Sequence, residues 1–174
     1  MSVIQILKKY RLKKRLKLNN TVSIHYDIGI SHIENLKIGD YVHLGKGTKI
    51  HSLGGVTIGR GTIFGPNVKI YSANHKYKDV EYIPYGFEYD KREVVIKENV
   101  WIGGEVIIVP GTIIGEGCII GSGTVLSGII PPLSIVIGNP CRVINTRSKE
   151  DYERLKNNDK VYLKHKMIKN KRRT

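Results

Sequence analysis

Apolar residues recur every six positions along residues 96–126. The large members of this series are Ile96, Ile102, Ile108, Ile114, Ile120 and Leu126. A small or β-branched residue stands two positions before each of them: Val94, Val100, Val106, Thr112, Cys118 and Thr124. Six residues make three strand alternations but not a whole number of helical turns, so both series point to the same side of an extended chain. The pattern predicts short strands whose inward faces form one column.

A turn must recur between these strands. Three positions after each of the five large apolar residues from Ile96 to Ile120 stands a corner residue, mostly of a type that tolerates positive φ: Asn99, Glu105, Gly111, Gly117 and Gly123. Pro110-Gly111 and Pro66-Asn67 have the sequence of type II turns. Short strands joined by regular corners form a solenoid, and three hexads close one triangular coil.

The same period predicts coils over residues 38–50, 58–70, 96–108 and 114–126, with a slip at Leu53–Gly55 and a weaker coil within 21–36. Between Ile70 and Val94 the period fails. This inserted loop, 71–93, contains six aromatic residues: Tyr71, Tyr77, Tyr82, Tyr85, Phe87 and Tyr89. A long loop at the corner of a rigid solenoid is a usual place for function. Its rings could form a platform for a sugar or a small core that keeps the loop folded.

The two ends of the chain have different patterns from the solenoid, predicted over 21–147. Residues 1–20 contain no Gly or Pro, and the apolar residues of Met1–Lys17 fall at helical spacing. They predict a short basic amphipathic helix that packs against the solenoid or lies on a membrane surface. After Leu126, the segment Ser127–Pro132 breaks the strand pattern.

The C-terminal segment, 148–174, is charged. Ser148 followed by Asp151 has the spacing of a capping box. It predicts a helix that continues through Leu155 and as far as Met167. This helix is too polar for a core element, and we expect it to lie across the solenoid or against a neighbouring copy.

The net charge of +14 is concentrated in these ends. Residues 1–20 carry seven basic residues and no acid, and residues 148–174 carry ten basic and four acidic residues. Residues 21–147 are nearly neutral, which argues against a basic groove for nucleic acid. Basic ends are typical of solvated tails or of attraction to an anionic membrane surface.

Cysteine content and hydropathy indicate the compartment. Of the two Cys, Cys118 is at an inward repeat position, so neither a disulfide framework nor a metal cluster is indicated. No run of 18 apolar residues and no apolar signal segment is present. The sequence predicts a cytoplasmic protein, with attachment to the inner membrane face through the basic ends as a further expectation.

Two motifs add a family resemblance. Val100-Trp101-Ile102-Gly103-Gly104 and Gly138–Ile144, together with the hexads, resemble the hexapeptide-repeat acyltransferases over residues 36–146. The similarity is greatest to bacterial sugar O-acetyltransferases of the maltose/galactoside and capsular-polysaccharide type. It implies an all-β, left-handed parallel β-helix, a homotrimer, and acetyl-CoA bound between adjacent solenoids without a metal.

The resemblance also implies roles for individual residues. His75, at the start of the inserted loop, corresponds to the catalytic base, and the amide of Gly104 to the oxyanion donor. Ser122 and Ser127 correspond to positions along the pantetheine arm, and Arg142 to one at the nucleotide end. The chain departs from the family pattern at Ser127-Gly128, where relatives usually have Thr-Lys, and at Lys76, where many have Pro.

The chemistry requires a base at this place. A sugar hydroxyl must lose its proton as it attacks the thioester, and an imidazole has a pKa near the working pH. Asn74, Tyr77 and Tyr85 are candidates for contacting the acceptor, and Asn74 or Asp79 could orient the imidazole. The other five His are predicted to be surface residues.

The predicted reaction is transfer of acetyl from acetyl-CoA to a hydroxyl of a sugar or surface-polysaccharide precursor. Transfer to an amino group of a nucleotide sugar or antibiotic is the alternative, because both acceptors need a base. A β-helical carbonic anhydrase is disfavoured because no two His are five positions apart. An ice-binding or scaffolding solenoid would lack the long insertion. Trp101 is predicted to pack at a corner.

Overall fold

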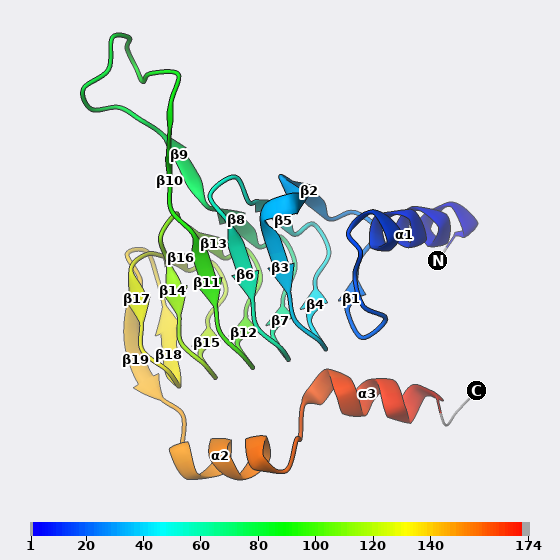
Figure 1. Ribbon diagram of the computed structural model, residues 1–174. Coiled ribbons are helices and arrows are strands. Elements are labelled where there is room, and N and C mark those ends of the chain that lie inside the picture. Colours follow the sequence, from blue (N-terminus) through cyan, green and yellow to red (C-terminus); the bar gives the residue numbers. More distant parts are fainter. Residues whose placement is uncertain (1, 172–174) are drawn as a thin grey trace.

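The structure, a computed structural model, describes residues 2–171 and is a triangular parallel β-helix with helices at both ends (Figure 1). Met1 and residues 172–174, which belong to the predicted terminal segments, lie outside the described residues. Three sheets form the sides of the prism. Sheet A has the order β1 (Ser23–Ile24), β4 (His43–Leu44), β7 (Ile63–Phe64), β12 (Trp101–Ile102), β15 (Ile119–Ile120), β18 (Ser134–Ile137) and β19 (Arg142–Thr146).

Two five-stranded sheets complete the prism. Sheet B has the order β16 (Val125–Leu126), β13 (Ile107–Ile108), β8 (Lys69–Tyr71), β5 (Lys49–His51) and β2 (Gly29–Ser31). Sheet C has the order β17 (Ile129–Ile130), β14 (Ile113–Ile114), β11 (Val94–Ile96), β6 (Val56–Ile58) and β3 (Leu36–Ile38). All neighbours in sheets B and C are parallel.

The hexad pattern is confirmed by the burial of its members. Each of the twelve inward residues of the 94–126 repeat is at most 1% exposed. The five predicted corner residues all have positive φ, including Asn99 (56°) and the non-glycine Glu105 (59°). Cys118 lies in the core, where burial raises the pKa of its thiol.

The coil length changes along the prism, and this corrects one prediction. Ile102 pairs with Ile120, 18 positions away. Ile50 pairs with Ile70, 20 positions away, because the predicted two-residue slip lies between them. Ile114 pairs with Ile130, only 16 positions away. The segment Ser127–Pro132 was expected to break the strand pattern, but it contains β17. The corner Ser127-Gly128 is two residues shorter than its predecessors, which hides the strand from a strict period of six.

The insertion is a β-hairpin rather than an irregular loop. Its strands β9 (Ala73–His75) and β10 (Tyr89–Lys91) are antiparallel, and the hairpin projects away from the prism (Figure 1). The Lys76 amide donates to the Glu88 carbonyl at 2.9 Å, and the two side chains form an ion pair. The neck of the hairpin is therefore held by main-chain and side-chain contacts.

The predicted terminal helices are present. Helix α1 (Val3–Arg15) has a capping box between Ser2 and Gln5. A short 3-10 helix, η1 (Ile33–Asn35), joins β2 to β3. No helix among residues 2–171 has the length and apolar character needed to span a membrane.

The C-terminal segment differs from its prediction in two ways. It forms two helices, α2 (Lys149–Asn157) and α3 (Tyr162–Lys171), because the chain turns at Asp159, which has positive φ (50°). It was expected to be too polar for a core element, and it lies outside the solenoid core, but three of its side chains, Tyr152, Val161 and Leu163, are only 6–7% exposed. The segment lies across the solenoid, one of the two expected placements. Ser148 accepts from the Asp151 amide at 3.1 Å, which is the first half of the capping box.

Candidate active site

The predicted site residues lie on two different edges of the prism. The A/B edge is the column of corners where the chain passes from sheet A to sheet B, and it contains Gly104 and Ser122. The B/C edge is the column of corners that follow the strands of sheet B. It contains Ser127, and the hairpin with His75 leaves the prism here, directly after β8. Within one chain a whole sheet separates His75 from Gly104.

Gly104 occupies a corner position that makes its amide available. The paired strands β7 and β12 place Pro66 at the equivalent corner one coil earlier, and β15 places Ser122 one coil later. The flanking amides are used: Gly103 donates to Ile120 and Glu105 to Pro66, at 2.8 and 2.9 Å. Among residues 2–171 no hydrogen bond from the Gly104 amide is present.

Ser122 and Arg142 extend this edge toward the end of the solenoid. A Cβ on Gly103 would lie 2.8 Å from Ser122 Oγ, so the two corners are in close contact. Arg142 begins β19 and pairs with Ile137, whose side chain would meet a Cβ on Gly121. All of β19 is exposed. The structure thus brings Gly104, Ser122 and Arg142 onto one edge, while Ser127 lies on the other.

His75 is held at the neck of the hairpin by two aromatic rings. Its imidazole stacks on Tyr85, with ring centroids 3.9 Å apart, and is tilted against Tyr89 at 4.5 Å. Tyr89 is the cross-strand partner of His75 in the β9–β10 pair. Within residues 2–171, His75 Nδ1 is the one buried side-chain N or O atom without a hydrogen-bond partner. The ring is therefore positioned by packing.

The other predicted residues of the hairpin have varied surroundings. Asn74 Oδ1 accepts a hydrogen bond from the His75 amide at 3.1 Å, so it holds the backbone rather than the ring. Tyr77 is 67% exposed. A hollow of about 350 Å³ beside the imidazole is lined by His75, Lys76, Tyr77, Lys78, Asp79, Asp90 and Arg92. The described contacts place Tyr85 against the imidazole, a role not expected from the sequence.

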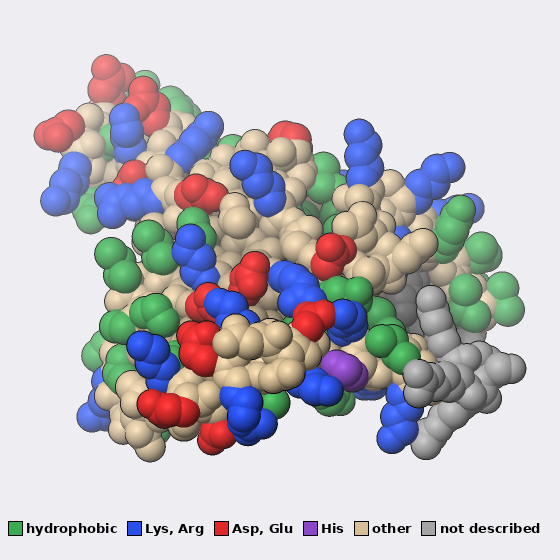
Figure 2. All heavy atoms as spheres, turned by 60° about the horizontal axis from the view of Figure 1, so that its bottom comes forward, with side chains coloured by type: hydrophobic (Ala, Val, Ile, Leu, Met, Phe, Trp, Pro, Cys, Tyr) green, Lys and Arg blue, Asp and Glu red, His purple; other side chains and the backbone are tan. Residues whose placement is uncertain are grey.

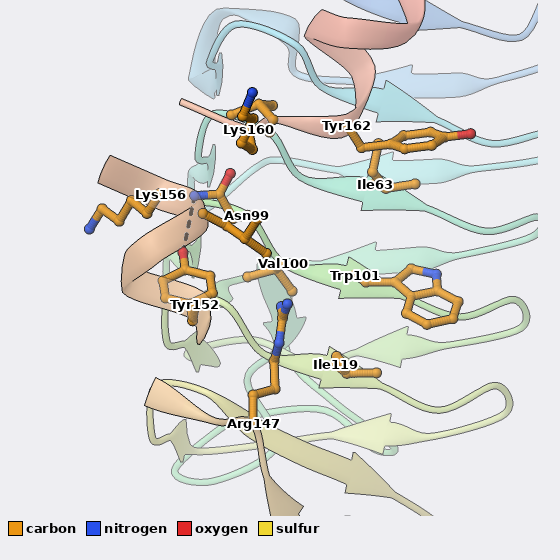
Figure 3. A pocket seen from close by; sticks show the side chains of 13 residues that line it. Ile63, Asn99, Val100, Trp101, Ile119, Arg147, Tyr152, Lys156, Lys160 and Tyr162 are labelled. Atoms are coloured by element: carbon orange, nitrogen blue, oxygen red, sulfur yellow. Dashed lines mark hydrogen bonds between the residues drawn. The ribbon is translucent and has the colours of Figure 1, made fainter. Parts of the chain in front are cut away.

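A larger cleft was missed by the sequence reasoning. It has a volume of about 670 Å³ and lies between sheet A and the C-terminal segment (Figure 3). Ile63, Trp101 and Ile119 point outward from sheet A into it, and Tyr152 and Val161 line the opposite wall. Trp101 is 57% exposed and stands on a strand, so its predicted packing at a corner is wrong. The sequence signal for this cleft was an apolar residue directly before the buried one in β7, β12 and β15.

The wall of this cleft is fixed by a polar cluster around Tyr152. Asn99 donates to the Tyr152 hydroxyl at 3.0 Å, and that hydroxyl donates to Glu116 at 2.7 Å (Figure 3 shows the first bond). Lys156 pairs with Glu116 at 2.6 Å. Burial and the Glu116 hydrogen bond raise the pKa of Tyr152. Among residues 2–171 no group of three or more His, Cys, Asp or Glu is arranged to hold a metal.

Comparison with known proteins identifies the family. The family model described as bacterial transferase hexapeptide (six repeats) matches residues 93–128. The Schizosaccharomyces pombe protein C18B11.09c is 33% identical over 148 residues, which cover 80% of this chain and 70% of that protein. The chain belongs to the bacterial hexapeptide transferase family.

Two bacterial relatives are similar over a smaller share of their own length. Nodulation protein L of Rhizobium leguminosarum bv. viciae is 42% identical over 119 residues, 68% of this chain and 60% of that protein. Galactoside O-acetyltransferase of Lactococcus lactis subsp. lactis is 33% identical over 62% of this chain and 51% of that protein. The chain thus spans about 50–60% of the length of these relatives.

Solved structures confirm the left-handed β-helix of the hexapeptide-repeat fold. The hexapeptide-repeat containing acetyltransferase VCA0836 of Vibrio cholerae, complexed with acetyl-CoA, has a TM-score of 0.65 at 22% identity, covering 80% of this chain and 85% of that one. The N-acyltransferase AntD of Bacillus cereus, complexed with an amino sugar nucleotide and CoA, has a TM-score of 0.70 at 20% identity, covering 84% and 94%.

Proposed function

We propose that the protein transfers an acetyl group from acetyl-CoA to a hydroxyl of a sugar or of a surface-polysaccharide precursor. The observation that carries the proposal is the imidazole of His75, clamped by two tyrosines beside a hollow in a chain of this family. A relative named galactoside O-acetyltransferase supports the choice of a sugar hydroxyl as acceptor. A solved structure of the same fold, complexed with acetyl-CoA, supports the choice of the acetyl donor.

In the proposed reaction His75 is the general base. It accepts the proton of the sugar hydroxyl as the hydroxyl oxygen attacks the thioester carbonyl. The resulting oxyanion receives a hydrogen bond from the Gly104 amide, a donor that is fixed before the reaction begins. Collapse of the tetrahedral intermediate forms the ester and expels the CoA thiolate, which takes the proton from His75. No covalent enzyme intermediate is required.

The separation of the two edges favours an oligomer. Because His75 leaves the B/C edge and Gly104 lies on the A/B edge, one chain does not bring them together. We propose a homotrimer in which the hairpin of one copy reaches the A/B edge of the next. Acetyl-CoA would lie along that edge, with Ser122 beside the pantetheine arm and the exposed Arg142 beside the phosphates. Ser127 would face the same groove from the hairpin-bearing copy.

The acceptor would enter the hollow beside His75. Tyr77 and Asn74 are the proposed acceptor contacts, since both are exposed at its rim or next to it. Tyr85 and Tyr89 are proposed as positioning residues for the imidazole. The proposed compartment is the cytoplasm, in keeping with the free thiols Cys118 and Cys141.

An amino acceptor is the second candidate. AntD, an N-acyltransferase bound to an amino sugar nucleotide, has the same fold, and a general base serves amines as well as hydroxyls. Release of free thiol from acetyl-CoA, followed with matched hydroxyl and amino sugars, decides between them.

The His75→Ala variant tests the proposal. We expect turnover to fall by about 10²–10⁴, with unchanged circular dichroism and unchanged mass in sedimentation velocity, because the hairpin lies outside the solenoid core. Tyr82→Ala, a change of another ring in the same hairpin, is the control and should retain most of the activity. Equal activity of His75→Ala and the wild type would contradict the mechanism.

A further inference from the structure

Helix α1 presents an apolar surface that no other part of the described chain covers. Val3, Ile4, Ile6, Leu7 and Tyr10 are 50–73% exposed. Figure 1 shows α1 extending from the N-terminal end of the prism, and Figure 2 shows hydrophobic side chains projecting at that end beside Lys and Arg side chains. A soluble surface rarely gathers this many large apolar residues on one short helix.

The helix has two distinct sides. Leu12 and Leu16, four positions apart, pack against the end of the solenoid core. Val3, Leu7 and Tyr10 also share one side, and with 3.6 residues per turn that side is about half a turn away from Leu12 and Leu16. The exposed apolar side is therefore not required for docking α1 onto the solenoid.

The same helix is strongly basic. Residues 1–20 carry seven basic residues and no acidic one. Five of these side chains are exposed: Lys8, Arg11, Lys14, Arg15 and Lys17. A second copy of the chain would bring like charges together on such a surface, whereas an anionic surface would neutralise them.

We propose that α1 is a docking helix for an anionic lipid surface. Its apolar side would enter the boundary between headgroups and acyl chains, and its basic residues would contact the anionic headgroups. Each basic residue near such a surface strengthens binding about fivefold, and salt weakens this contribution.

Two basic side chains of the C-terminal helices are paired with carboxylates. These helices lie on the solenoid, where Lys156 pairs with Glu116, and Lys164 with Asp159. The expectation from the sequence concerned both basic ends, and the present proposal concerns α1, where exposed apolar and basic side chains occur together.

Sedimentation of the full chain with lipid vesicles tests the proposal. We expect binding to vesicles of phosphatidylcholine and phosphatidylglycerol, weaker binding as salt rises, and little binding to phosphatidylcholine alone. Replacing both Ile4 and Leu7 by Gln keeps the charge and should weaken binding at least about tenfold, since two large apolar side chains are lost. The control is Ile83→Gln, at a 97% exposed position in the hairpin, which should bind as the wild type does.

Two results would overturn the proposal. Binding of the double variant at wild-type strength would mean that charge alone attracts the chain to lipid. A lower mass of the double variant than of the wild type in sedimentation velocity would mean that the apolar side of α1 is an interface between copies.

Discussion

The corners at Pro66, Gly104 and Ser122 hold three different residue types at one backbone position in successive coils. Pro66 has no N–H, so the fold does not need a donor at this position. Gly104 supplies a donor there, and among residues 2–171 its hydrogen is not used. The solenoid therefore does not need an N–H at this corner, whereas the proposed reaction does.

Replacing Gly104 by Pro removes the amide hydrogen and keeps a residue type that this corner accepts. Gly104→Ala is the matched control, because both variants add a Cβ, about 3.1 Å from Pro66 Cδ, while Ala keeps the N–H. We expect kcat of Gly104→Pro to be about 10²–10³ lower than that of Gly104→Ala. Equal kcat values, with both proteins folded, would remove the amide from the mechanism.

The contacts of individual side chains were the hardest part of the structure to predict from the sequence. The resemblance pointed to His75, but its contact with Tyr89 follows from the hairpin register, and its contact with Tyr85 follows from the fold of the hairpin loop. A period of six says nothing about an antiparallel insertion. Tyr85 was therefore considered as an acceptor contact or as part of a small core in the loop, and its contact with the imidazole was not expected.

At the scale of elements, two glycine corners test what holds the solenoid to its C-terminal segment. Gly117 and Gly123 have almost the same φ, 70° and 73°. A Cβ on Gly117 would lie 2.7 Å from Leu133 Cδ2 and 2.8 Å from the Tyr152 ring, whereas a Cβ on Gly123 meets nothing within 4 Å. Comparing an Ala substitution at each of the two positions therefore separates the cost of a left-handed backbone from the cost of displacing neighbouring side chains.

We expect Gly123→Ala to lower the free energy of unfolding by about 1–2 kcal/mol, the cost of a left-handed non-glycine residue. Gly117→Ala should cost clearly more, because the side chains of Leu133 and Tyr152 must also move. Urea denaturation measures both. Equal losses would show that neither Leu133 nor Tyr152 is firmly packed on this corner.

Asp159 provides a pH test of the same segment. Its carboxylate contacts Lys164 and Arg60, which lower its pKa from 3.8 to about 2. Since the folded pKa lies below the unfolded one, this contribution is present above pH 3.8 and is lost as the pH falls toward 2.

Hydrogen exchange of α3, corrected for intrinsic rates, should show protection falling over that range. In Asp159→Asn the protection should already be lower near neutral pH and should change less below it. An identical acid dependence in both proteins would assign the effect to other carboxylates, such as Glu116.

The repeating elements were predictable because each hexad obeys the same local rule. Val94–Leu126 was predicted residue by residue, including the left-handed corners. Strand β17 was missed because the preceding corner is short, and the burial of Tyr152 and Val161 was missed because they are isolated apolar residues in a charged segment. Their burial depends on grooves over Gly61 and Gly117 that arise only when the coils stack.

At the scale of the whole molecule, the proposed site has two halves on two edges. The hexad pattern predicts the coils of one chain, but it does not predict which edges of neighbouring chains are in contact. Gly104, Ser122 and Arg142 follow one edge, and the hairpin with His75 leaves from the other. The central claim is that neighbouring copies join these halves.

Co-expression of His75→Ala and Gly104→Pro chains with different tags tests this claim most directly. Each variant alone should be nearly inactive. Mixed trimers isolated through both tags contain one neighbour pair with an intact His75 and an intact Gly104, so turnover should return to about one third of the wild-type value. Mixed assemblies that are as inactive as their parents would contradict a site shared between copies.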